Sequence, residues 1–353
     1  MTGDPTTTTA IRTPRALLEA LVATPSVSGE EDAAAALLVD YFAAHDREAF
    51  VDEVGNVHAP GDDAVLLTSH VDTVPGDVPV RVEDGVLWGR GAVDAKGPLC
   101  AMAVAAVRTG VSFVGVVGEE YDSRGARHLL ETRTQPRALI NGEPSGWDAV
   151  TLGYRGLLAG TYVGTSPSGH ASRPEPNAIE EAIDWWGRIE VAFSTDRWAT
   201  VTERVTAKPL RFSGGLTDDG IAVEATVDVQ FRVPLDADAG AVRDTVESQL
   251  GDGGAGEASI TWKDAVPPVL VDRRGPLPAA FRRHIRAQGG DPRLLVKTGT
   301  SDMNLYADAW DCPMVTYGPG NSDLDHTPDE RIALAEYDRS IAILEAVCET
   351  LVV

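Results

Sequence analysis

Short apolar runs alternate with helix-forming stretches along the first part of the chain. Apolar residues fill positions 64–67 and most of 111–117, and an alanine-rich stretch from Pro98 to Val107 separates these runs. Unbroken apolar runs of this length are typical of strands that are buried on both faces. Thr13-Pro14 and the capping-box pattern from Ser28 to Glu31 predict the starts of two earlier helices. Strands that alternate with helices predict an α/β fold in which helices cover both faces of a mainly parallel sheet.

The pattern changes after Gly156. Apolar and polar positions alternate over residues 158–163 and 222–233, as in strands that expose one face, and residues 177–189 between them have helical spacing. The α/β character returns near Pro267. The middle of the chain is therefore predicted to be an inserted α+β domain.

Two domains follow from this change of pattern. Residues 1–156 and 265–353 are predicted to form one discontinuous domain, which closes with a helix from about Leu334 to Leu351. Residues 157–264 form the insert, whose length lies within the usual range for a domain.

The charge balance narrows the range of partners. The chain has 54 acidic and 30 basic residues among 353, a net charge of −24, which disfavours nucleic acids and anionic membranes. No apolar run reaches the roughly 18 residues of a membrane span, and Met1 to Arg12 lack a signal-peptide core. We therefore expect a cytoplasmic protein. The three cysteines are too few and too widely spaced for a disulfide framework or a cysteine metal cluster.

The acidity also suggests a salty environment. Lysine occurs only at positions 96, 208, 263 and 297, whereas acidic residues are spread along the whole chain. Repulsion on this scale requires screening, and the Debye length shrinks to about 3 Å at 1 M salt. We predict a halophilic protein; ordinary acidity with chance depletion of lysine is the alternative.

Histidine and carboxylate side chains collect where predicted strands end. His70 and Asp72 follow the apolar run at 64–67, and in an extended segment they lie on one side. A carboxylate there can accept the second imidazole N–H and fix the tautomer that binds a metal. The alternative is a hydrogen-bonded loop histidine without a metal.

Carboxylates occur in two further segments of this kind. Asp94 lies in a glycine-rich segment ahead of the alanine-rich helix, and Glu119 and Glu120 end the run at 111–117. Asp94 could simply cap a helix, and Glu119 and Glu120 could be solvated surface groups. Like charges this close are costly unless they are neutralised, and two metal ions would neutralise them.

Two final segments complete the set. Glu143 ends a predicted strand, and His326 lies in a turn before the last helix. Two imidazoles and several carboxylates form the nitrogen and oxygen ligand set expected for Zn²⁺, Co²⁺ or Mn²⁺.

These five segments, in this order, resemble the zinc aminoacylase and carboxypeptidase family M20, which includes acetylornithine deacetylase and succinyl-diaminopimelate desuccinylase. The resemblance implies a dinuclear centre in the discontinuous domain, with Asp94 bridging. One ion would be held by His70, Asp94 and Glu143, and the other by Asp94, Glu120 and His326.

The resemblance also implies how the reaction is catalysed. Glu119 would accept a proton from the water between the ions and pass it to the departing amine, and Asp72 would support His70. This agrees with general chemistry, because two ions can activate water and polarise a carbonyl while one unligated carboxylate moves protons.

The insert resembles the family's lid and dimerisation domain. His170 matches a histidine that stabilises the oxyanion in the neighbouring subunit's site, and Arg232 matches an arginine that grips the substrate carboxylate, a task suited to a guanidinium. A homodimer is therefore implied. A structural loop histidine and a surface arginine are the alternatives.

Two segments, residues 173–179 and 297–304, are most similar to one subgroup of the family. They supply the remaining candidates for substrate binding, which are Asn177, Gly299, Thr300 and Ser301. Backbone N–H groups of the turn at 297–304 can form an anion nest. The subgroup releases lysine or ornithine from a small acidic amino-group carrier protein of the LysW type, in lysine or arginine biosynthesis. The substrate is an amide between the side chain of the carrier's C-terminal glutamate and the amino acid's α-amino group.

We accordingly predict a metal-dependent hydrolase of linear amides with two divalent ions, zinc or cobalt, and manganese as a third candidate. One alternative is a deacylase of acetylornithine, acetylcitrulline or succinyl-diaminopimelate. The other is a catalytically silent family member that acts as a binding or regulatory protein.

Overall fold

The chain folds into two compact units. The computed structural model describes residues 11–170, 172, 174–194, 199–251 and 256–352. The first unit contains the described parts of Met1–Leu152, Val271–Leu295 and Ser301–Val353, and the second contains those of Gly153–Leu270 and Val296–Thr300. The divisions thus fall a few residues from the predicted 156 and 265. In addition, residues 296–300 group with the second unit, where Arg155 N–H donates to Lys297 O at 3.3 Å.

The first unit is built around one large sheet, although the edge strand β13 falls within the residue range of the second unit. Its strand order is β1-β2-β6-β3-β7-β15-β8-β13, with β14 paired to β8. The four central strands, β6, β3, β7 and β15, run parallel, whereas the flanking pairs are antiparallel. The strands are β1 (Phe50–Val51), β2 (Val57–Ala59), β3 (Asp62–His70), β6 (Val111–Val116), β7 (Leu139–Gly142), β8 (Ala149–Tyr154), β13 (Val269–Leu270), β14 (Arg293–Lys297) and β15 (Met314–Thr316).

Helices enclose this sheet, and a smaller sheet adjoins it. The helices are α1 (Pro14–Val22), α2 (Asp32–Ala43), α3 (Lys96–Thr109), α4 (Arg124–Thr132), α7 (Pro276–Ala287), α8 (Asp302–Ala309) and α9 (Leu334–Val352), with one turn of 3₁₀ helix, η2 (Ser322–Leu324). The small sheet has the order β16-β5-β4. Its strands are β4 (Arg81–Glu83), β5 (Val86–Trp88) and β16 (Arg331–Ala333). The mixed α/β fold with a parallel centre confirms the prediction from sequence.

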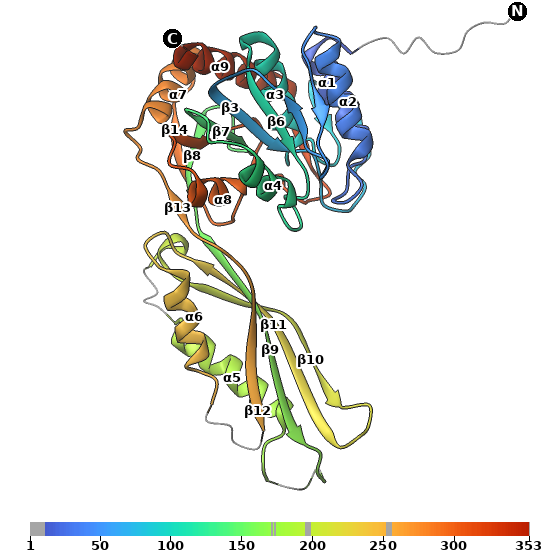
Figure 1. Cartoon of the computed structure of the whole chain (residues 1–353), viewed down its shortest axis with the longest axis vertical. Coiled ribbons are helices and arrows are strands. Elements are labelled where there is room, and N and C mark those ends of the chain that lie inside the picture. The colour runs from blue at the N-terminus through green and yellow to red at the C-terminus, as the bar shows by residue number, and fades with distance from the viewer. Residues whose placement is uncertain (1–10, 171, 173, 195–198, 252–255, 353) are drawn as a thin grey trace, which may run out of the picture. The chain divides into compact units, whose positions relative to one another are not determined.

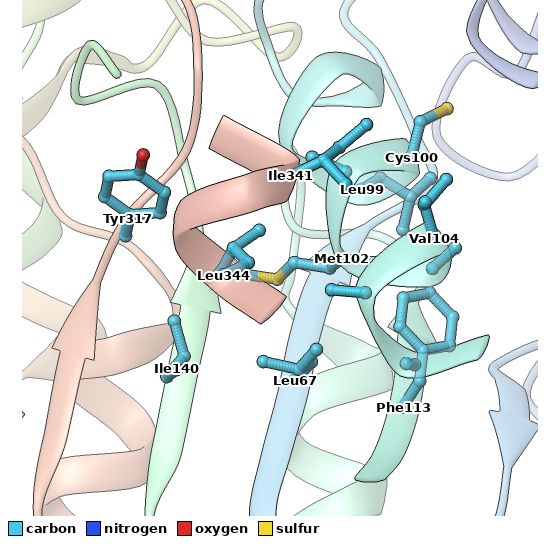
Figure 2. Packing of buried hydrophobic residues seen from close by; sticks show 14 of the residues in the cluster. Leu67, Leu99, Cys100, Met102, Val104, Phe113, Ile140, Tyr317, Ile341 and Leu344 are labelled. Carbon is cyan, nitrogen blue, oxygen red and sulfur yellow. The ribbon is translucent and has the colours of Figure 1, made fainter. Parts of the chain in front are cut away.

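The core of the first unit lies between its helices and the central strands. Helices α3 and α9 pack against each other and against β3. Figure 2 shows Met102 of α3 and Leu344 of α9 facing Leu67 of β3 and Ile140 of β7. Helix α3 is buried around almost its whole circumference, as expected for a helix that is apolar on every side. Its small residues let it pack closely against neighbouring elements on each side. Cys100 is one of these small core residues.

One of the two predicted helix starts is confirmed and the other is wrong. The Thr13 side chain accepts a hydrogen bond from Ala16 N–H at the start of α1. The predicted capping box at Ser28 does not form, because α2 begins at Asp32 and its N-cap, Glu31, makes no side-chain cap. Instead Ser28 Oγ donates to Asp72 Oδ2 at 2.7 Å. A tertiary contact has replaced the local one.

The second unit is a separate α+β body. Its antiparallel sheet has the order β10-β11-β9-β12, and helices α5 and α6 pack against it (Figure 1). Burial alternates residue by residue along β9, as predicted for a strand with one covered face. The elements are β9 (Gly156–Pro167), α5 (Ala178–Ala192), η1 (Val201–Glu203), β10 (Thr206–Leu216), β11 (Ala222–Val233), α6 (Ala239–Glu247) and β12 (Glu257–Val266).

Within the described residues, no helix combines the length and apolar character that crossing a bilayer requires. Residues 1–10, which carry most of the sequence interpreted as lacking a signal-peptide core, lie outside the described part of the chain.

Candidate metal centre

Three neighbouring parallel strands deliver the first candidate ligands. His70 is the last residue of β3, Glu119 and Glu120 follow β6, and Glu143 follows β7. Because β6, β3 and β7 are adjacent and parallel, their carboxyl ends meet at one edge of the sheet, where open α/β sheets bind ligands. The sheet topology therefore gathers side chains that are up to 73 residues apart in sequence.

Asp94 lies between the two imidazoles. Its Oδ1 is 3.2 Å from His70 Nε2, and its Oδ2 is 3.1 Å from His326 Nε2. One carboxylate thus faces two histidines, one through each oxygen, as a bridging ligand must. Donor atoms of His70, Asp94 and Glu120 all lie within 4.8 Å of one another.

The other two carboxylates each lie near one of the histidines. Glu120 Oε1 is 2.9 Å from His326 Nε2, and Glu143 Oε1 is 3.9 Å from His70 Nε2. Asp94 thus contacts both histidines, whereas the mutually close group of His70, Asp94 and Glu120 draws members from both groups expected from the sequence. The assignment of the five side chains as metal ligands stays a prediction.

The charges in this cluster favour cations. Burial alone lowers the pKa of His70, but hydrogen bonds with Asp72 and Asp94 and the charge of Glu143 outweigh it and raise the pKa well above its usual value. Hydrogen bonds with Asp94 and Glu120 raise the pKa of His326 to about 10. Both imidazoles are thus pulled toward their charged form by surplus carboxylate. Nitrogen and oxygen donors with excess negative charge fit divalent metal ions.

Asp72 holds the loop that follows β6. Its Oδ1 accepts the backbone N–H of Glu119 and its Oδ2 accepts that of Glu120, both at 3.1 Å. The sequence predicted that this carboxylate would hold the imidazole of His70. The structure places His70 Nδ1 closer to the backbone oxygen of Asp72, at 2.9 Å, than to its Oδ1, at 3.6 Å. Asp72 thus orients the histidine mainly through its main chain, while its carboxylate positions Glu119 and Glu120.

Glu119 and Glu120 differ in their surroundings. Glu120 contacts His326, whereas no hydrogen bond joins the Glu119 carboxylate to another described residue. Burial raises the pKa of Glu119, and the charge of Glu143 raises it further. A carboxyl group that is unligated and readily protonated is suited to proton transfer.

Sequence reasoning missed two buried residues that brace the centre. Glu330 Oε1 accepts the backbone N–H of Val93 at 3.0 Å and of Asp94 at 3.1 Å, and its Oε2 pairs with Arg90 Nη1 at 2.7 Å. Asn56 clamps both ends of the Glu119 loop, because its Oδ1 accepts Val117 N–H and its Nδ2 donates to Gly125 O, each at 3.1 Å. Neither contact has a local sequence signal, since the partners lie far apart in the chain.

The remaining candidates lie mostly in the second unit. His170 is exposed, and its Nδ1 lies 2.8 Å from Ser172 Oγ. Arg232 Nη1 donates to Thr300 Oγ1 at 3.1 Å, which brings two predicted substrate-binding residues together. Gly299 belongs to the same unit.

Asn177 and Ser301 have structural roles in addition to the predicted one. Asn177, in the second unit, caps α5, and Ser301, in the first, caps α8, each within a capping box. The backbone N–H of Ser301 donates to Asn304 Oδ1, so it does not contribute to the predicted anion nest.

Known proteins are similar to this chain in sequence and in architecture. The profile of peptidase family M20/M25/M40 matches residues 66–350. The LysW-lysine hydrolase of Deinococcus radiodurans is 38% identical over 358 residues, which cover 96% of this chain and 97% of that protein. A putative LysW-lysine/LysW-ornithine hydrolase of Thermococcus kodakarensis is 38% identical over 341 residues, covering 95% and 91%. A dinuclear metal-binding peptidase of the M20 family from Bacillus subtilis has a similar structure, with a TM-score of 0.71, 16% identity and coverage of 96% and 97%.

The chain belongs to peptidase family M20/M25/M40, and it is a metal-dependent hydrolase of amide bonds. The resemblance inferred from the five segments is thereby confirmed. Its curated relatives in Deinococcus and Thermococcus match over nearly their whole length and are named for LysW-linked lysine and ornithine.

Proposed function

We propose that this chain hydrolyses the amide that joins lysine or ornithine to a small acidic carrier protein of the LysW type. The observation that carries the choice of substrate is the 38% identity with a LysW-lysine hydrolase along nearly the whole of both chains. The product would place the enzyme in lysine or arginine biosynthesis. The intact cluster around Asp94 argues against a catalytically silent member.

The residues fit two divalent ions and a single proton carrier. His70, Asp94 and Glu143 would hold one ion, and Asp94, Glu120 and His326 the other. Once bound, such a pair activates water and polarises the scissile carbonyl. Glu119 accepts the proton of the attacking water and delivers it to the nitrogen of the leaving amino acid, so that the carbon–nitrogen bond breaks and a free amine departs.

Groups of the second unit would hold the substrate. Arg232, with Thr300 at 3.1 Å, binds the carboxylate of the released amino acid, since a guanidinium matches a carboxylate in shape and charge. Asn177 and Gly299 of this unit are further candidates for substrate binding, as is Ser301 of the first unit. His170 would donate to the developing oxyanion of the scissile carbonyl.

We propose zinc or cobalt as the native metal, with manganese as the third candidate, because the imidazole and carboxylate donors suit all three. The three cysteines are buried, and none is among the clustered candidate ligands of the described residues. Reconstitution of metal-free protein with each ion in turn, followed by turnover measurements, will rank them.

We also propose a homodimer formed through the second unit. Strand β10 is at an edge of its sheet and exposes Leu210, Phe212 and Leu216, and an open apolar edge is a site for pairing. Sedimentation should give twice the mass of the chain. If His170 acts on the partner's site, mixing His170→Ala chains with Glu119→Gln chains should restore part of the activity that each lacks alone.

Turnover of defined substrates tests the proposed reaction. Metal-loaded protein is incubated with carrier-linked lysine, carrier-linked ornithine and acetylornithine, and the free amino acid is measured by mass spectrometry. We expect release from a carrier-linked substrate, and none from the Glu119→Gln control. Release from acetylornithine alone would instead establish a small-molecule deacylase.

A further inference from the structure

Three arginines gather at one end of the sheet in the second unit. Arg155 precedes β9, Arg232 lies near the end of β11, and Arg204 lies two residues before β10. In the register of the sheet, Thr206 of β10 is directly opposite Arg232. Arg204 lies at a bend just ahead of β10, with φ −133° and ψ 149°, and Arg155 Nη1 donates to Thr206 Oγ1 at 3.0 Å. The three guanidinium groups therefore share one region of this unit.

The three differ in how their nitrogens are used. Arg155 is tied to its own unit, because its Nε donates to Thr298 O at 2.9 Å and its Nη1 to Val201 O and Thr206 Oγ1 at 3.0 Å. Arg232 makes one side-chain hydrogen bond to a described residue, to Thr300 Oγ1. The Nε of Arg204 is buried and has no hydrogen-bond partner in the described part of the chain. Arg204 and Arg232 thus keep donors for a ligand, whereas Arg155 supports them.

This concentration of positive charge contrasts with the rest of the protein. In a chain of net charge −24, other arginines pair with carboxylates, for example Arg90 with Glu330 at 2.7 Å and Arg293 with Asp148 at 2.6 Å. No ion pair among residues the structure describes includes Arg204 or Arg232.

The arginines also repel one another. Burial lowers the pKa of Arg155, and the charges of Arg232 and Arg204 lower it further. Burial likewise lowers the pKa of Arg232. A half-buried cluster of like charges is stabilised when an anion binds between or beside them.

We propose that Arg204 and Arg232 bind two carboxylates of one substrate, one on each side of the scissile amide. This assignment rests on the proposed function, in which the bond joins a glutamate side chain to an α-amino group. Such a substrate carries the free terminal carboxylate of the glutamate on one side and the carboxylate of the amino acid on the other. Arg204 lies ahead of β10 and Arg232 lies on β11, so the two guanidinium groups come from different segments and can serve separate carboxylates.

A second guanidinium at this place would make the site selective between substrates. An N-acetyl amino acid has a carboxylate on the amine side alone, so it would leave one half-buried guanidinium without a counterion. A bidentate guanidinium–carboxylate contact is among the stronger hydrogen-bonded pairs. Arg204 would therefore favour glutamyl amides over the acetylated substrates of other family members.

Equilibrium binding tests the proposal without turnover. The protein is the metal-loaded Glu119→Gln chain, and the probes are a dipeptide with lysine's α-amino group on the glutamate side chain and its two mono-amides, each with one carboxylate capped. Calorimetry gives the dissociation constants. We expect Arg204→Gln and Arg232→Gln each to weaken binding of the uncapped probe by about tenfold or more. For each variant, the loss of affinity should disappear with one of the two mono-amides. The mono-amide concerned should differ between the two variants.

Arg211→Gln is the matched control. It removes the same charge from β10, but Arg211 is 72% exposed and pairs with Asp228, so the affinity should not change. Arg204→Lys, which keeps the charge but not the planar fork, should bind with intermediate affinity, and it serves in place of Arg204→Gln if that variant does not fold.

Two results would overturn the proposal. One is an unchanged affinity in both arginine variants, and the other is loss of the effect with the same mono-amide for both. Failure of the proposed function would look different: the wild-type chain would release no amino acid from a carrier-linked substrate, whatever the binding data show.

Discussion

Glu330 Oε1 accepts the backbone N–H of Asp94 at 3.1 Å. The two residues come from segments 236 positions apart, and Glu330 is only four residues beyond His326. Glu330 is fully buried, and Arg90 neutralises it at 2.7 Å. This contact fixes the segment that presents Asp94 relative to the segment that presents His326.

Replacing Glu330 with glutamine should weaken metal binding. Glutamine keeps an acceptor for the N–H groups but loses the charge opposite Arg90, so the segment carrying Asp94 is held less firmly. We expect affinity to fall about 10–100-fold, the usual effect of removing a group that orients metal ligands. Competition with a chelator measures it, and Asp329→Asn, which removes an exposed neighbouring charge, is the control. Equal affinities in the two variants would contradict the role given to Glu330.

Substitutions of Glu119 and Glu120 should have different effects on catalysis and on metal binding. Glu119→Gln should lower kcat about 10²–10⁴-fold and keep both ions, because an amide cannot carry the proton. Glu120→Gln should lose metal as well as activity, since its carboxylate contacts His326 at 2.9 Å. Elemental analysis together with steady-state kinetics distinguishes the two. A Glu119 variant that is depleted of metal would show that this residue is itself a ligand.

Asp52 should make the stability of the folded state depend on pH. Burial raises the pKa of its carboxyl, but hydrogen bonds from His58 and Asn56 outweigh burial and lower it below its usual value. A lowered pKa in the folded state contributes stability above the unfolded value of about 3.9, and that contribution is lost as the pH falls through the folded value.

Asp52→Asn should therefore lower the free energy of unfolding at pH 7, and the deficit relative to wild type should shrink as the pH falls below about 4. Urea unfolding in the presence of a chelator, at pH 7 and pH 3, measures it without interference from metal release. Asp40→Asn, at an exposed position on α2, should show no such dependence. A deficit of the same size at both values of pH would contradict the prediction.

Salt should stabilise the fold. With 54 acidic and 30 basic residues, repulsion across the surface decreases as the Debye length falls from about 10 Å at 0.1 M to about 3 Å at 1 M. We expect the Tm to rise by roughly 5 °C or more over this range, which corresponds to roughly 4 kcal/mol of added stability for a chain of this length. Calorimetric melts in NaCl and KCl measure it, and a Tm that does not rise would dismiss a high-salt origin.

The sequence predicted those parts of the molecule that depend on local pattern. Apolar runs located β3 and β6, because a strand that is buried on both faces is apolar at successive positions. The alternation at 222–233 located β11, because a strand that is buried on one face alternates apolar and polar residues. The cluster around Asp94 could be anticipated because its members end such strands in a recognisable order.

The bracing residues could not be predicted in the same way. Ser28 fits a local capping box but instead binds Asp72, 44 residues away. Asn56 and Arg204 have no motif at all, and their roles depend on which strands are neighbours in the folded sheets. Side-chain contacts between distant segments are decided by tertiary packing, which overrides local preference.

The position of His326 in the chain has a consequence for synthesis. His70, Asp94 and Glu143 all precede His326 in the chain, and His326 comes 183 residues after Glu143. A growing chain on the ribosome could therefore assemble the half of the centre around His70 long before it contains the second imidazole. Premature termination anywhere upstream of His326 would leave the pair of histidines incomplete.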